Sequence, residues 1–95
     1  MNIEKSKADW ETFKRNNETS EEFTGSQLMY KFAMENNRIS KGDVVSDSKG
    51  SVKVTFVGVT ISLEGFPFCT YHGVELDAKG NEKKAYRTIF QINIK

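Results

Sequence analysis

Cys69 and His72 are the side chains best suited to reactive chemistry, and each residue type occurs once in the 95 residues. A cysteine nucleophile needs a base beside its sulfur, which favours the thiolate. The two residues lie three positions apart in a segment of strand-like alternation, so their side chains point to opposite faces. We therefore expect a small, half-buried cysteine and a structural histidine, with no catalytic residues.

Metal-ligating side chains are also too few for a built site. One His and one Cys cannot complete the tetrahedral set of a structural zinc ion. Asp43 and Asp47 lie around a turn near Ser46 and Ser48, but the segment lacks the acid spacing and terminal glutamate of a calcium loop. We interpret both aspartates as turn and capping residues, and we expect no metal, no cofactor and no enzymatic activity.

A candidate protein interface lies on the C-terminal strands. If Phe66 and Phe68 face the core, alternation places Tyr71 on the outer face, beside Arg87 and Ile89 of the next strand. Tyr and Arg are enriched among residues that dominate binding energy, so Tyr71, Arg87 and Ile89 are the predicted partner-binding residues. The alternative is that a helix covers this face and Tyr71 is simply packed, since Tyr is commonly half-buried.

A second candidate surface surrounds the last hairpin. Its cations and ring could bind nucleic acid, with lysines on phosphates and the aromatic stacked on a base; the residues are Lys79, Lys83, Lys84 and Tyr86. The alternative is that the lysines only solvate and protect a sheet edge. Acidic neighbours at Glu75, Asp77 and Glu82 dilute the positive charge.

Composition and charge are those of an ordinary globular domain. Fourteen basic and 13 acidic residues give a net charge of +1, and both signs are evenly spread, which lowers the expectation of a duplex-binding face. A lone cysteine forms no internal disulfide. The polar start and the lack of a long apolar run match neither a signal peptide nor a membrane span. We therefore expect a cytoplasmic protein with one domain over residues 1–95.

Two short helices are predicted before residue 38. The first has a capping pattern at 6–9, docks through Trp10 and Phe13, and ends at the asparagines 16–17. The second begins at 24–27, carries an apolar stripe that includes Phe32, and ends near Asn36. One longer helix over 20–36 is the alternative, with Gly25 in its interior at a cost of roughly 1 kcal/mol.

The strand over 52–63 is the most informative stretch of the sequence. Its apolar residues occupy even positions through Phe56 and odd positions from Val59 onward. A regular strand cannot keep both sets on one face. We therefore predict a bulge at Val57-Gly58, where glycine tolerates the distortion.

Residues 39–95 form the β part of the domain. After a short strand at 44–45 and the bent strand come two more, with tight turns at 47–50 and 77–81. We expect the helices to cover the face that carries Phe66, Phe68 and Phe90. The predicted fold class is α+β: two short N-terminal helices followed by a four-stranded antiparallel meander, strongly bent or closed into an SH3-like barrel.

The segment Gly42–Lys95 resembles the small SH3-like barrels of the Tudor and KOW type. The resemblance consists of the Gly-Asp-Val-Val opening at 42–45, the bent second strand and the tight hairpins. It implies a small curled barrel. It carries no family-specific motif, so no functional residue is transferred.

These features favour a small non-enzymatic binding module that docks onto another protein. An adaptor or inhibitor of the kind carried by phages and mobile elements fits this description. The alternative is a small barrel that binds single-stranded nucleic acid or RNA. A protein partner is expected, no membrane is expected, and self-association stays open.

Overall fold

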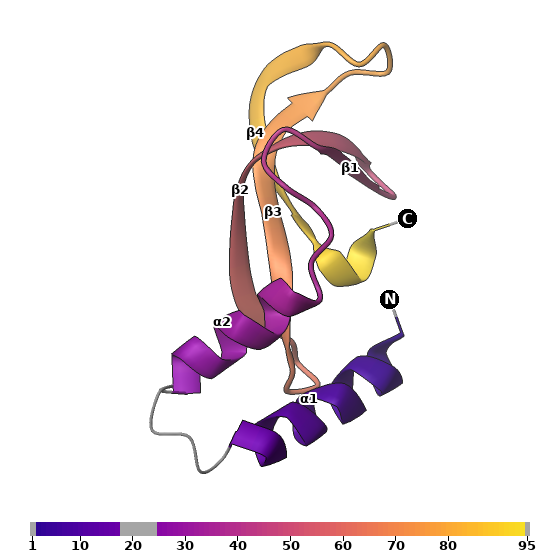
Figure 1. The fold of residues 1–95 in the computed structure, drawn as a ribbon. Coiled ribbons are helices and arrows are strands. Elements are labelled where there is room, and N and C mark those ends of the chain that lie inside the picture. The colour runs from indigo at the N-terminus through magenta and orange to yellow at the C-terminus, as the bar shows by residue number, and fades with distance from the viewer. Residues whose placement is uncertain (1, 18–24, 95) are drawn as a thin grey trace.

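The structure is a computed structural model that describes residues 2–17 and 25–94. Over these residues it places two helices before a four-stranded antiparallel sheet (Figure 1). The elements are α1 (Ile3–Asn17), α2 (Gly25–Glu35), β1 (Val44–Asp47), β2 (Gly50–Ile61), β3 (Pro67–Leu76), β4 (Glu82–Phe90) and a 3-10 turn, η1 (Gln91–Asn93). The strands lie in the order β1-β2-β3-β4, and the sheet curls into a half-barrel. The predicted α+β class and meander are confirmed.

Both helices lie where the apolar pattern predicts them. α1 begins earlier than the pattern at Ser6 suggests, because the Asn2 side chain accepts the backbone N–H of Lys5 at 3.0 Å and acts as the N-cap. The rings of Trp10 and Phe13 lie 5.2 and 5.3 Å from the ring of Phe32, so α1 docks on α2. The connection at 18–24, where the longer-helix alternative begins, lies outside the described residues. Within the described ranges, no helix is long and apolar enough to cross a membrane.

The core consists of two clusters. One lies between α2 and the concave side of the sheet, called the inner face below; its buried residues are Ala33, Val45, Val52, Val54, Cys69, Tyr71 and Ile89. The other lies where the helices meet the turn between β2 and β3; its buried residues are Trp10, Phe32, Phe66 and Phe68. The predicted burial of Phe32 is confirmed.

The bulge in β2 is present, but it lies nearer the start of the strand than predicted. The register shifts between Val54 and Phe56, whereas Val57 and Gly58 pair regularly with β3. The predicted change of parity holds, because Val54 is buried and Val57 packs against the same cluster. The predicted position was wrong because Phe56 was counted with the core set. Its ring is in fact 61% exposed on the convex side, called the outer face below.

The predicted faces are inverted on β4 and at Tyr71 of β3, whereas Phe66 and Phe68 are buried against the helices as predicted. Tyr71 and Ile89 are buried on the inner face, while Phe90 is 43% exposed on the outer face. The Tyr71 hydroxyl donates to Asn37 Oδ1 at 2.7 Å, and the Cys69 thiol donates to the Ala33 carbonyl at 3.4 Å. Because α2 and the segment after it supply these partners, burial of the polar atoms leaves none unsatisfied. The alternative of a helix over a packed Tyr71 is the arrangement observed.

The last strand ends sooner than the alternation predicts. η1 follows Phe90 directly, and Ile92 and Ile94 turn back to pack against the core clusters. The Gln91 side-chain oxygen accepts the backbone N–H of Cys69 at 2.9 Å. This bond takes the place of the backbone hydrogen bond that a longer β4 would make to β3. This change of direction brings η1 to the end of α2, and in Figure 1 it lies above the two helices.

Candidate functional site

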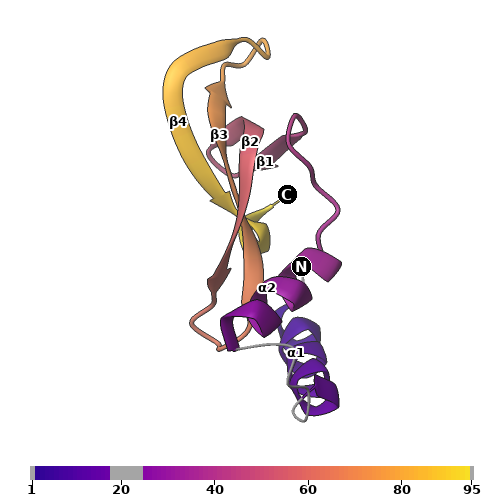
Figure 2. The ribbon, with the colours of Figure 1, turned by 60° about the vertical axis from the view of Figure 1, so that its left-hand side comes forward.

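The outer face of the sheet carries exposed aromatic side chains on the side away from the helices. Figure 2 shows α1 and α2 together on one side of the sheet and no helix on the other side. Three aromatic side chains on this open side are solvent-exposed, namely Phe56, Phe90 and Tyr86, the last at 79%. The three rings lie on the same face, on β2 and β4 to either side of β3, and exposed apolar side chains that form a contiguous patch are typical of interaction sites.

Local sequence explains why these rings face outward. The bulge at Thr55 turns Phe56 away from the inner face, where Val54 lies. On β4, strict alternation places Tyr86 and Phe90 opposite the buried Ile89. The outer face therefore receives one ring from β2 and two from β4.

His72 lies at the centre of the outer face, between these rings. Its ring is 5.4 Å from the ring of Phe56. Nε2 lies 2.9 Å from the hydroxyl of Thr70, and Nδ1 lies 2.8 Å from the hydroxyl of Thr88. The two hydroxyls can each donate or accept, so they match either neutral tautomer of the imidazole. These two hydrogen bonds fix the orientation of the His72 ring. The polar side-chain atoms at the centre of the outer face therefore bond to one another.

Gly58 provides the space that this arrangement needs. A Cβ atom at position 58 would lie 2.8 Å from Thr70 Oγ1 and 3.2 Å from His72 Nε2. The glycine is therefore required by close side-chain approach on the outer face, and not by the bulge for which the sequence suggested it.

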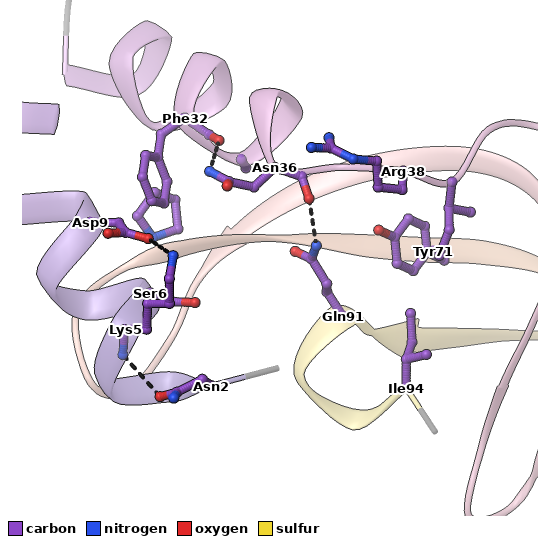
Figure 3. Close-up of a pocket in the computed structure, with 13 residues that line it drawn as sticks. Asn2, Lys5, Ser6, Asp9, Phe32, Asn36, Arg38, Tyr71, Gln91 and Ile94 are labelled. Atoms are coloured by element: carbon purple, nitrogen blue, oxygen red, sulfur yellow. Dashed lines mark hydrogen bonds and ion pairs between the residues drawn. The ribbon is translucent and has the colours of Figure 1, made fainter.

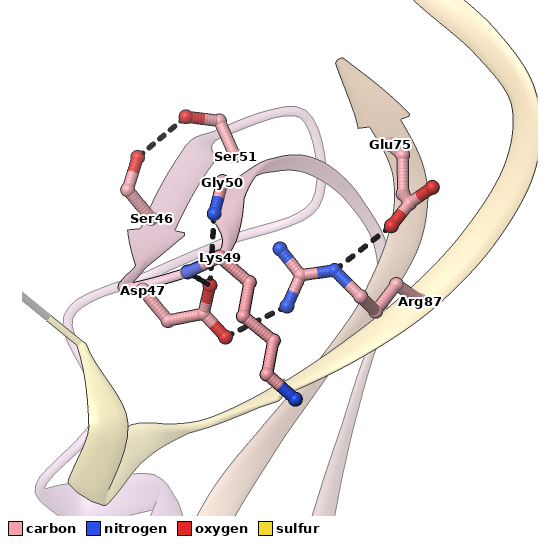
Figure 4. A network of polar contacts seen from close by, with 7 residues as sticks. All are labelled: Ser46, Asp47, Lys49, Gly50, Ser51, Glu75 and Arg87. Atoms are coloured by element: carbon pink, nitrogen blue, oxygen red, sulfur yellow. Dashed lines mark hydrogen bonds and ion pairs between the residues drawn. The ribbon is translucent and has the colours of Figure 1, made fainter. Parts of the chain in front are cut away.

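Arg87 lies on the other side of β4 and forms a three-residue ion network (Figure 4). Its Nη1 lies 2.7 Å from Asp47 Oδ2, and its Nε donates to Glu75 Oε1 at 3.0 Å. Asp47 also accepts the backbone N–H groups of Lys49 and Gly50, which confirms its predicted role in the turn. The hydrogen bond from Arg87, aided by these N–H groups, lowers the pKa of Asp47 to about 2.

The predicted partner-binding set is therefore placed differently from expectation. Tyr71 and Ile89 are buried beneath α2, and Arg87 is occupied by two carboxylates. Burial raises the pKa of the Tyr71 hydroxyl far above its ordinary value. The interpretation of these three residues as an outward-facing surface is wrong, because alternation separates two faces but does not say which one a helix covers.

The predicted nucleic-acid set is only partly brought together. Lys79, Lys83, Lys84 and Tyr86 are all exposed. The register between β3 and β4 shifts between Val74 and Leu76, so alternation does not carry from Tyr86 to Lys83 and Lys84, and Lys79 lies in the hairpin loop. Lys53 lies in the row of Tyr86 across the sheet and is 3.9 Å from Glu82.

The structure separates Cys69 from His72, as the sequence predicts. Cys69 is buried on the inner face, and burial raises its thiol pKa. A neutral, enclosed thiol without a neighbouring base is a poor nucleophile. The described residues contain no group of three or more His, Cys, Asp or Glu side chains that could hold a metal ion.

A cavity of about 370 Å³ lies between α1, the end of α2 and η1 (Figure 3). Its polar groups bond mainly to one another: Lys5 pairs with Asp9 at 2.9 Å, and Gln91 donates to the carbonyl of Asn36 at 3.3 Å. Arg38 also lines it and donates to two backbone carbonyls.

Sequence reasoning missed Phe56, Phe90 and His72 as surface residues. The sequence could have indicated an exposed Phe56, because a bulge one or two residues before Val57 also places the valines of this strand on one face. For Phe90, the alternation itself was correct and only the side covered by the helices was misjudged. No family model, curated protein or solved structure matches this chain. The resemblance to SH3-like barrels accordingly stays a prediction.

Proposed function

We propose that this protein is a non-enzymatic binding module that docks onto another protein through the outer face of its sheet. The observation that best supports the proposal is the group of exposed rings, Phe56, Tyr86 and Phe90, around the fixed imidazole of His72. Rigid aromatic side chains lose little entropy on binding and are common anchors of protein interfaces. An adaptor or inhibitor acts through such a surface alone.

The chemistry of the face indicates the chemistry of the partner. Its centre offers rings and internally bonded polar atoms, while Lys53 and Lys84 stand toward the end where β4 begins. A complementary surface would present an apolar centre and acidic side chains at that end. Rim charges of this type affect mainly the association rate, whereas the rings supply affinity.

The proposal is tested by comparing two tyrosines with different positions. Tyr86→Ala should weaken partner binding by about tenfold or more, which corresponds to roughly 1.4 kcal/mol. Tyr30→Ala is the matched control, because Tyr30 is 54% exposed on α2, on the opposite side of the sheet. A partner is first captured from the native host with the parent protein. Titration calorimetry then measures its affinity for the parent protein and for each variant. Equal loss with both variants, or no loss with Tyr86→Ala, would contradict the proposal.

Binding of single-stranded nucleic acid is the second candidate function. Its specific support is that Lys84 and Tyr86 are both exposed and lie two residues apart on β4, so a phosphate and a stacked base could be bound close together. Lys84→Glu should then abolish binding of a labelled oligonucleotide, and the affinity should fall steeply with salt. A protein interface centred on the rings should change little with salt.

We also propose that the protein works in the cytoplasm. The support is its single cysteine, which is buried and free, since small secreted domains more often carry several disulfides. A reporter fusion expressed in the native host and fractionated by compartment tests this assignment.

A further inference from the structure

The second half of β2 is an edge of the sheet, because it pairs with β3 on one side and with no strand among the described residues on the other. β1 pairs with β2 only from Gly50 to Lys53, and the backbone of 42–43 adds bonds to Val54. Among the described residues, no strand pairs with positions 55–61 on the side away from β3. Figure 1 shows this lower half of β2 as the border of the sheet.

The backbone groups that this border exposes can be assigned. The Ser62 N–H donates to the Phe66 carbonyl at 2.8 Å, so position 62 bonds toward the chain of β3. Antiparallel strands alternate in this respect, and positions 60 and 58 therefore bond inward as well. The N–H and C=O groups of Val57, Val59 and Ile61 consequently point outward, away from β3.

This border also lacks the usual protection against pairing. Natural edge strands carry charges, prolines or covering segments. The opposite edge strand, β4, carries Glu82, Lys83, Lys84 and Arg87. In contrast, positions 55–61 read Thr-Phe-Val-Gly-Val-Thr-Ile, with no charge and no proline and with many β-branched residues. Ile61 is 52% exposed, and Leu63 just beyond it is fully exposed.

We propose that two copies of this chain pair through the β2 edge, antiparallel and about a two-fold axis at Val59. In this register Val59 lies opposite Val59 of the second copy, and Val57 lies opposite Ile61. All three positions have outward-pointing backbone groups, so each pair can exchange both hydrogen bonds. The pairing is isologous and closes at two copies.

The second copy is favoured over another occupant by self-complementarity. When residues 57–61 pair antiparallel with the same residues of a second copy, the central Val59 and the outer Val57 and Ile61 all fall at hydrogen-bonded positions. The same register brings the exposed Ile61 against Val57 of the second copy and extends apolar cover toward Leu63. The segment carries no charge, so the two copies meet there without repulsion. This inference goes beyond the proposed function and does not depend on the outer face.

The first test uses a matched pair of substitutions and light scattering over a dilution series. Ile61→Glu places a charge on the proposed edge and should weaken self-association by at least about tenfold. Val44→Glu makes the same kind of change at a residue of similar exposure, 56%, on β1, opposite Lys53. The parent chain and Val44→Glu should dimerise as concentration rises. A parent chain that stays monomeric throughout, or an Ile61→Glu variant that dimerises like Val44→Glu, overturns the proposal.

The second test reports the register on the parent chain and needs no variant. The amide hydrogens of Val57, Val59 and Ile61 should exchange quickly with solvent in dilute samples and slowly in concentrated ones, by nuclear magnetic resonance. Those of Gly58 and Thr60 should be slow at both concentrations, because they bond to β3. A dimer in which the first three amides stay fast uses another surface and also overturns the proposal.

Discussion

The guanidinium of Arg87 and the carboxylate of Asp47 lie 2.7 Å apart, and this contact joins the two edge strands of the sheet. β1 and β4 stand at opposite ends of the strand order, so only the curl of the sheet brings them within reach. The second contact, from Arg87 to Glu75 at 3.0 Å, fixes the guanidinium from the side of β3. β1 and β4 are not paired through their backbones, so the network links them through side chains and stabilises the half-barrel at its open side.

Removal of this cation should loosen the curl. Arg87→Met keeps much of the apolar stem but removes the cation that Asp47 and Glu75 share, so the free energy of unfolding should fall. Lys53→Met is the control, since its pair with Glu82 is 3.9 Å long and exposed and should contribute little. Urea titration followed by circular dichroism measures both. Equal effects would mean that the network adds nothing to stability.

The same network predicts how stability depends on acid. Asp47 has a folded-state pKa of about 2 against an ordinary value of 3.8. Because the folded pKa is lowered, its contribution to stability is complete above pH 3.8 and is lost as pH falls toward 2. Asp47→Asn should therefore be less stable at neutral pH and should lose less stability on acidification through this window.

The comparison must be made as a difference between parent and variant. Asp77 also has a lowered pKa, because the backbone N–H groups of Asn81 and Lys79 donate to its carboxylate, and it titrates in both proteins. Denaturant midpoints measured through this pH range supply the two curves. Parallel curves would show that Asp47 does not interact differently in the folded and unfolded chains.

Three glycines should rank in a fixed order when replaced by alanine. At Gly73 an added Cβ would lie 1.9 Å from the carbonyl oxygen of Lys53, which is backbone and cannot move aside. At Gly58 the nearest atom is the Thr70 hydroxyl at 2.8 Å, so the loss should be about 1–3 kcal/mol, the range for overpacking. At Gly25 no atom lies within 4 Å. Unfolding free energies should follow the order Gly73, Gly58, Gly25 from largest to smallest loss, and Gly58→Ala as harmless as Gly25→Ala would refute the crowding on the outer face.

Two phenylalanines that the sequence predicts to be buried, one on a helix and one on a strand, should differ in their contribution to stability. Phe32 is buried between the helices and the sheet, so Phe32→Ala should cost about 3–5 kcal/mol. Phe90 keeps much of its ring in solvent, so Phe90→Ala should cost clearly less. Thermal and chemical unfolding of both variants decides this. A loss at Phe90 equal to that at Phe32 would mean that the outer face is covered in solution.

Much of the fold follows from local rules. Tight turns predicted at 47–50 and 77–81 are present, and Gly50 and Gly80 have the positive φ that such turns favour, 144° and 85°. The helical stripe that includes Phe32 and the change of parity in β2 are also local signals. These elements depend on neighbouring residues alone, so one sequence suffices to find them.

The candidate site depends on information of a different kind. β3 is apolar on both faces, since Phe66 and Phe68 alternate with Cys69 and Tyr71 and all four are buried. Periodicity then divides the side chains correctly but cannot choose the face on which α2 docks. That choice depends on fit between distant segments, such as the hydroxyl of Tyr71 meeting Asn37. The position of the bulge was ambiguous for a related reason, because Phe56 suits a core and an exposed aromatic surface equally well.

The enclosed thiol of Cys69 offers a direct view of how the helical layer separates from the sheet. Its sulfur is buried and donates to the carbonyl of Ala33, so a reagent reaches it when α2 lifts away from β3 or when a larger part of the fold opens. Since the chain has one cysteine, each molecule that is modified records one such opening. The rate of thiol labelling under native conditions therefore sets an upper limit on the undocking of α2 without any engineered probe.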